Sequence, residues 1–104
     1  MVRIVVISPY RFKAQNKFNS LIDSIVRKNP IIEATTDEFN NNCYVVFANE
    51  TSLERIIAIP KDISQLLTDK YFDIVYIDKD YNEDETWTIR QHLIGQQSKP
   101  IIFF

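Results

Sequence analysis

The feature that most constrains the fold is the continuous apolar run IVYI at residues 74–77, which leads directly into the charged cluster Asp78, Lys79 and Asp80. Short runs rich in β-branched and aromatic residues are typical of strands in a parallel sheet that are buried on both faces. In such sheets, ligands bind outside the carboxyl ends of the strands. The segment 72–81 is therefore expected to be a doubly buried strand with the candidate site at its end.

Strand-like and helix-like segments alternate along the rest of the chain. Further strands are expected at residues 2–8, 31–36, 43–48, 53–59 and 101–104, and helices at residues 14–28, 61–71 and 82–95. A polar turn separates segments 43–48 and 53–59, which predicts a β-hairpin. Strands that alternate with helices indicate one α/β domain over residues 1–104, with a small, mostly parallel sheet flanked by helices.

Capping residues support two of the expected helices. Asn82 is followed three residues later by Glu85, which is the signature of a capping box, and Gly95 is a natural C-terminal stop. Asp62 is a suitable N-cap for the shorter helix. The first helix is expected to stop at Asn29, because the residue before a proline disfavours helical geometry.

Composition limits the classes of function. The formal net charge of −2 gives no general attraction to nucleic acid or membranes. No apolar run approaches the roughly 20 residues of a membrane span, and the N-terminus lacks a signal peptide, so we expect a cytoplasmic protein without membrane contact. The single cysteine, Cys43, is expected to be a small core residue. Gly95 is the only glycine, so neither glycine-rich phosphate-binding motif is present.

Two acidic residues form the candidate metal or nucleotide site. Asp78 and Asp80 offer hard carboxylate oxygens at a strand end, which suit Mg²⁺. Lys79 between them lowers the local negative charge. The alternative is a solvated acidic loop that opens the following helix, and the spacing leaves both interpretations open.

A basic patch is the second candidate. Arg3, Arg11, Lys13 and Lys17 lie near the first strand and the helix after it, and with neighbouring aromatic residues they could contact a nucleic-acid backbone. An ordinary solvated helix face is the alternative. His92, the only histidine, is expected on a helix surface, and no catalytic triad, zinc cluster or motif for covalent catalysis is present.

The arrangement resembles part of the ATPase core of viral DNA-packaging terminase large subunits, and more loosely the helicase-type P-loop ATPases. Segments 4–18, 44–52, 74–78, 84–94 and 99–104 match in order the family's second strand and Gln-bearing helix, an Asn-Gly-Ser hairpin strand, the Walker B strand, the helix after it and the next strand. The resemblance covers nearly the whole chain. It implies a P-loop-ATPase-like or Rossmann-like half, with Asp78 in the position of the metal-associated aspartate.

The sequence departs from that family at the residues that carry chemistry. The family's phosphate-binding loop precedes the matched region, and the acid after the Walker B aspartate is Lys79 here. A protonated lysine cannot act as a base. Glu50 replaces the turn glycine. We therefore expect no catalytic residue and no ATP hydrolysis by this chain alone, and Mg²⁺ only with a partner chain.

The last expected strand carries a partner prediction. The resemblance implies that the family's phosphate-loop strand lies beside this strand, so its absence would leave an apolar edge formed by Ile101, Ile102, Phe103 and Phe104. Exposed apolar edges invite pairing with another strand. We expect this edge to be covered by the chain itself or to bind a second copy or a partner protein.

Three functions remain open at the level of sequence. The first is a small, viral, non-catalytic interaction or regulatory module linked to DNA packaging or a helicase machine. The second is a split-ATPase subunit that needs a partner's phosphate-binding loop. The third is a receiver-like signalling domain, which the Lys99-Pro100 pair favours and the absence of an acidic pair after the first strand disfavours.

Overall fold

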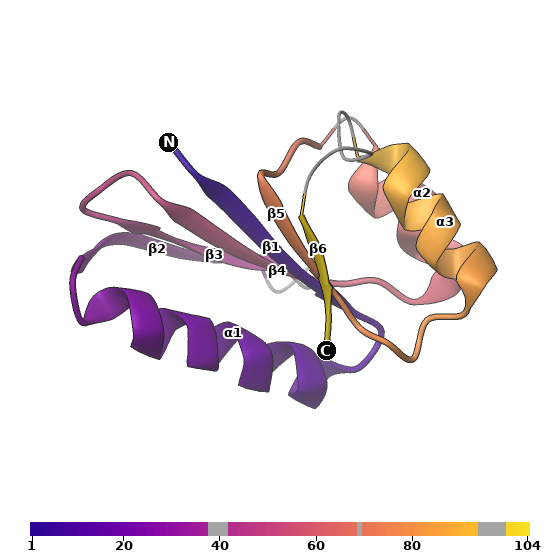
Figure 1. Ribbon diagram of the computed structural model, residues 1–104, viewed down its shortest axis with the longest axis horizontal. Coiled ribbons are helices and arrows are strands. Elements are labelled where there is room, and N and C mark those ends of the chain that lie inside the picture. The colour runs from indigo at the N-terminus through magenta and orange to yellow at the C-terminus, as the bar shows by residue number, and fades with distance from the viewer. Residues whose placement is uncertain (38–41, 69, 94–99) are drawn as a thin grey trace.

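Six strands form one sheet with helices on both faces (Figure 1) in the computed structural model, which describes residues 1–37, 42–68, 70–93 and 100–104. The strands are β1 (Arg3–Ser8), β2 (Ile31–Asp37), β3 (Asn42–Phe47), β4 (Ser52–Ile57), β5 (Ile74–Ile77) and β6 (Ile101–Phe103). The helices are α1 (Arg11–Val26), α2 (Ile63–Leu67), α3 (Glu83–His92) and the short 3₁₀ helix η1 (Pro60–Asp62). The predicted α/β class, the flanking helices and the hairpin of β3 and β4 are confirmed.

The sheet is mixed, with the order β2-β3-β4-β1-β5-β6. Strands β4, β1, β5 and β6 are parallel neighbours, whereas β2 and β3 pair in antiparallel fashion at one side. This order differs from the all-parallel, doubly wound sheet of a receiver-like domain. The receiver-like alternative therefore does not fit the structure.

Two apolar cores hold the layers together. On one face, Val75 and Ile77 of β5 pack with residues of β1, α2 and α3, including Leu67 and Ile89. On the other face, α1 inserts Phe18 against the central strands. Figure 1 shows α1 on one side of the sheet and α2 and α3 on the other.

The central, doubly buried strand is β1, which corrects the expectation for segment 72–81. Residues 4–8 of β1 are all buried, whereas β5 alternates between buried and partly exposed side chains. The partly exposed residues, Ile74 and Tyr76, face the α1 side. Because α1 lies over β1 and β4, it leaves this face of β5 only partly covered.

Local signals were confirmed at the start of α3 and at the hairpin turn between β3 and β4. The Asn82 side chain accepts from the Glu85 N–H at 2.8 Å, and the Glu85 carboxylate accepts from the Asn82 N–H at 2.9 Å, which completes the capping box. In the hairpin turn, Asn49 accepts from the Thr51 N–H at 3.1 Å. Glu50 has a φ of 68°, in the left-handed region that favours glycine.

Other boundaries differ from expectation. The predicted helix at 61–71 is only η1 followed by α2, and Asp62 occupies the N-cap position of α2 without a side-chain capping bond. The proposed stop at Gly95 lies outside the described residues. Cys43 is half-buried against the α1-side core, where burial raises the pKa of its thiol. Within the described ranges, no helix is long and apolar enough to cross a membrane.

Candidate functional site

The structure places Asp78 at the carboxyl end of β5, beside the end of the central strand. Ile7 of β1 and Ile77 of β5 are partners in the parallel register, so Ser8 and Asp78 follow side by side. The Asp78 N–H donates to the Ile7 carbonyl at 3.0 Å, which continues the pairing one residue beyond β5. The carboxylate is thereby fixed at the edge where parallel sheets place their ligands.

Asp78 is completely buried, and both of its carboxylate oxygens accept hydrogen bonds. Oδ2 accepts from the Ser8 hydroxyl at 2.6 Å. Oδ1 accepts from the Lys13 ammonium at 2.5 Å and from the Asp80 N–H at 2.8 Å. A buried carboxylate needs such partners, because an isolated charge in the protein interior is strongly disfavoured.

Lys13 reaches this carboxylate from the first turn of α1. Helix α1 begins at Arg11, directly after β1, so its first turn lies next to the strand ends. The Lys13 ammonium also lies 3.3 Å from a carboxylate oxygen of Asp80 and 5.8 Å from the Phe104 ring. Lys13 therefore bridges the two acidic residues that the sequence suggested for a cation.

The protonation of the pair follows from these contacts. Burial raises the pKa of Asp78, but the bonds from Lys13, Ser8 and the Asp80 N–H outweigh burial and hold that pKa below its ordinary value. The hydrogen bond to Asp78 raises the pKa of Lys13 against an opposing effect of burial. At neutral pH the site is a carboxylate and an ammonium.

This geometry does not fit a bound metal ion as it stands. Lys13 occupies the position from which a cation would contact Asp78, and the second carboxylate oxygen is engaged by Ser8. Among the described residues, no group of three or more His, Cys, Asp or Glu side chains could hold a metal. Mg²⁺ would have to displace the Lys13 ammonium, whose charge already compensates that of Asp78.

The residues of the predicted basic patch do not all lie together. Arg11 and Lys13 begin α1 at the carboxyl end of β1, whereas Arg3 begins β1 at its opposite end. The Arg3 guanidinium lies over the Phe72 ring at 5.1 Å, and Lys17 lies 4.9 Å from the centre of the Tyr76 ring. The structure thus groups Lys13 and Lys17 near β5 and β6 and leaves Arg3 apart.

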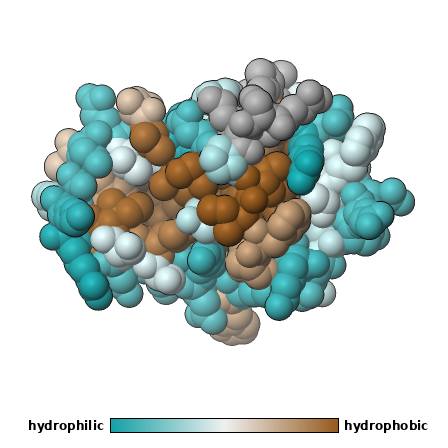
Figure 2. All heavy atoms as spheres, viewed as in Figure 1, coloured by the Kyte–Doolittle hydropathy of each residue, from teal (hydrophilic) through white to brown (hydrophobic). Residues whose placement is uncertain are grey.

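The four residues of the predicted edge interface lie on β6 and directly after it. Ile101 packs against the core on the α2 and α3 side, and Phe104 packs against the α1-side core. Ile102 and Phe103 are 42% and 49% exposed. Figure 2 shows apolar side chains gathered at the surface where Figure 1 places β6.

The sequence did not predict the roles of two polar residues in the interior, Ser8 and Arg55. Ser8 completes the Asp78 site, and its position at the end of a strand parallel to β5 was the available signal. Arg55 on β4 is 7% exposed, donates to the Gln15 side chain of α1 and leaves its Nε without a partner among the described residues. In the pattern LERII, nothing in the sequence indicated that Arg55 would be buried.

Comparisons with known proteins show what the fold is similar to. Neither a known protein family nor a curated protein matches the sequence. The ATPase domain of the large terminase of Thermus phage P74-26 superposes with a TM-score of 0.60 at 11% identity, over 98% of this chain and 46% of that chain. The large terminase of a thermophilic bacteriophage, solved in complex with ADP, gives a TM-score of 0.59 at 7% identity, over 98% of this chain and 25% of that chain.

The chain has the fold of part of a phage terminase ATPase domain. The resemblance expected from the sequence is therefore confirmed for the fold. The chain spans 46% of one solved chain and 25% of the other. What those terminases bind or do is a property of those proteins.

Proposed function

We propose that this chain is an ATPase-like interaction or regulatory module, connected with viral DNA packaging or a helicase machine, that does not hydrolyse ATP by itself. The likeness of its fold to phage terminase ATPase domains supports the connection with packaging. The contacts of the strand-end aspartate support the non-catalytic role. We expect such a module to act through its surfaces.

The ion pair between Lys13 and Asp78 carries this proposal. By resemblance, Asp78 holds the position of the metal-associated aspartate, but its charge is compensated by a lysine of the same chain at 2.5 Å. The next residue, Lys79, is exposed, and a lysine ammonium has no lone pair with which to activate water. Asp80 is itself bound to Lys13.

Calorimetric titration with MgATP tests the proposal directly. We expect no binding heat with the wild-type chain, and the same result with Lys79→Met, which removes an exposed lysine next to the site. Binding of MgATP by the wild-type chain that is lost in Asp78→Asn would contradict the proposal. Unfolding curves for each variant establish that the comparison is between folded proteins.

The split-ATPase alternative predicts a different titration. If another polypeptide supplies a phosphate-binding loop, MgATP should bind only to the mixture of the two chains, and Asp78→Asn should abolish that binding. The observation that favours this alternative is the position of the exposed strand β6 beside the Asp78 end of β5, where the Lys79 N–H donates to the Phe104 carbonyl at 2.9 Å.

A further inference from the structure

Strand β6 forms a free edge of the sheet in the part of the chain that the structure describes. It pairs in parallel with β5 on one side only. The Pro100 carbonyl accepts from Val75, and the Phe104 N–H donates to the Ile77 carbonyl, both at 3.1 Å. Because bonding direction alternates along a strand, the backbone N–H and C=O groups of Ile101 and Phe103 face away from β5 and point outward.

Apart from its short length, this edge lacks the features by which proteins usually protect free edges. The strand contains no charged residue and no proline between Ile101 and Phe103, and only its short length limits pairing. Its side chains Ile102 and Phe103 are about half exposed. An additional strand would bury apolar surface and satisfy the outward backbone groups in one step.

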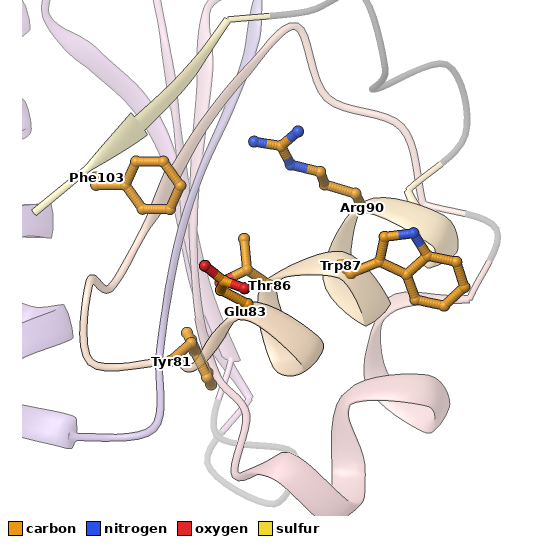
Figure 3. Close-up of a pocket in the computed structure, with 6 residues that line it drawn as sticks. All are labelled: Tyr81, Glu83, Thr86, Trp87, Arg90 and Phe103. Atoms are coloured by element: carbon orange, nitrogen blue, oxygen red, sulfur yellow. The ribbon is translucent and has the colours of Figure 1, made fainter.

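A pocket next to the edge continues the apolar surface onto α3. Phe103 and Trp87, which is 63% exposed, line this open cavity of about 410 Å³ (Figure 3). Glu83 and Arg90 line it as well, and both are exposed. Neither has an ion-pair partner among the described residues.

The two charged residues mark opposite ends of the pocket. They are seven residues apart on α3, which corresponds to two turns on one face and about 10 Å along the axis. Strands β5 and β6 are parallel and α3 connects them, so α3 runs opposite to β6. Glu83 is therefore level with the end of β6, and Arg90 is level with its beginning.

We propose that two copies of this chain pair through β6 about a two-fold axis, which joins their sheets into one. Strand β6 lies antiparallel to its counterpart, with Ile102 facing Ile102 of the second copy. Ile101 then lies opposite Phe103 of the second copy, and these two residues exchange both backbone hydrogen bonds. The inference rests on the proposed role as an interaction module and identifies the partner as a second copy.

Charge complementarity favours a second copy over an unrelated strand. A two-fold interface brings each surface against itself, so it requires a surface that is complementary to its own rotated image. An acidic residue at one end of the pocket and a basic residue at the other meet this requirement. Rotation about Ile102 places Glu83 of each copy opposite Arg90 of the other, while Phe103 and Trp87 become covered.

Disulfide trapping tests the predicted register. Residues that face each other in a non-hydrogen-bonded antiparallel pair have Cα atoms about 4.5 Å apart, within the range for a disulfide. In a Cys43→Ser background, we expect Ile102→Cys to form a covalent dimer rapidly under mild oxidation. The matched control is Ile32→Cys in the same background, because Ile32 is an isoleucine on β2 at the opposite edge and is 65% exposed.

Charge reversal tests the two-fold symmetry. By sedimentation, Glu83→Arg and Arg90→Glu should each weaken dimerisation by about ten-fold, because each places like charges opposite one another. The double variant with both reversals should restore the dimer. A heterologous partner with fixed charges would not follow this pattern.

A wild-type chain that stays monomeric up to about 100 µM would overturn the inference, since a specific dimer of modest affinity forms below that concentration. Equal cross-linking of the Ile32→Cys control, or a double reversal that remains monomeric, would also overturn it. A monomer that captures a strand from another protein would assign the edge to that partner. MgATP titration tests the proposed function separately, so failure of one proposal is distinguishable from failure of the other.

Discussion

At the scale of single residues, the ion pair between Lys13 and Asp78 determines what the strand end can do. The side chain of Asp78 is fully buried, and that of Lys13 is 31% exposed. Removal of one partner leaves the other charge without compensation. Removal of both partners leaves no charge that needs compensation. The two residues should therefore be strongly coupled in their effect on stability.

A double-mutant cycle measures this coupling. We expect Lys13→Met to lower the free energy of unfolding by about 2 kcal/mol, less than for a fully buried pair because water reaches Lys13. The double variant Lys13→Met/Asp78→Asn should be destabilised by less than the sum of the single effects, as urea unfolding would show. Strict additivity would mean that the two side chains do not interact.

The pKa directions predict how this contribution depends on pH. The pKa of Asp78 is lower in the folded state, so its stabilisation is present above the unfolded pKa of about 3.9 and is lost as the pH falls through the folded value. The pKa of Lys13 is raised, so its contribution is present below about 10.4 and is lost as the pH rises through the folded value. Urea unfolding from pH 7 down to pH 3 should show a steeper loss of stability for the wild type than for Asp78→Asn.

At the scale of elements, local signals in the sequence were sufficient wherever neighbours in the chain make the structure. The capping box at Asn82 and the hairpin of β3 and β4 depend on residues a few positions apart, and both were predicted. The expected helix at 61–71 was too long, because its first residues form the 3₁₀ helix η1 and α2 already ends at Leu67. The role of Lys13 was missed because its partner lies 65 residues away.

The start of α3 offers a test at this scale. Asn82→Ala removes the side-chain acceptor for the Glu85 N–H and should destabilise the protein by about 1 kcal/mol. Asn82→Asp keeps an acceptor and should retain most of the stability. Thermal unfolding followed by circular dichroism measures both variants, and an alanine variant as stable as the wild type would show that the cap contributes nothing.

At the scale of the whole molecule, the order of strands in the sheet could not be predicted from the sequence. Parallel pairing joins segments that are distant in the chain, so apolar runs such as 74–77 showed that a strand exists without showing its neighbours. From the sequence, segment 72–81 was predicted to be the doubly buried strand, a position that β1 holds in the structure. The candidate site is nonetheless at Asp78, because β5 is adjacent to β1 and both strands end at the same edge.

The central position of β1 predicts the distribution of local stability. Amide hydrogen exchange should be slowest in β1, which is paired with β4 and β5 and buried from residue 4 to residue 8. Strand β2, at the opposite edge to β6, should exchange through local opening with a much smaller free energy. Exchange in β1 as fast as in β2 would show that the sheet does not unfold from its edges.

The ion pair of Lys13 with Asp78 has a consequence for how this end of the sheet responds to its surroundings. The fraction of a binding site that a dissolved ion fills depends on the concentration of the ion. The Lys13 ammonium belongs to the same polypeptide as Asp78, so it is present at every concentration of salt or nucleotide. The loop that holds Asp80 is bound to this ammonium and to Asp78. Any partner that contacts this end of the sheet would therefore meet one constant shape, independent of the energy state of the cell.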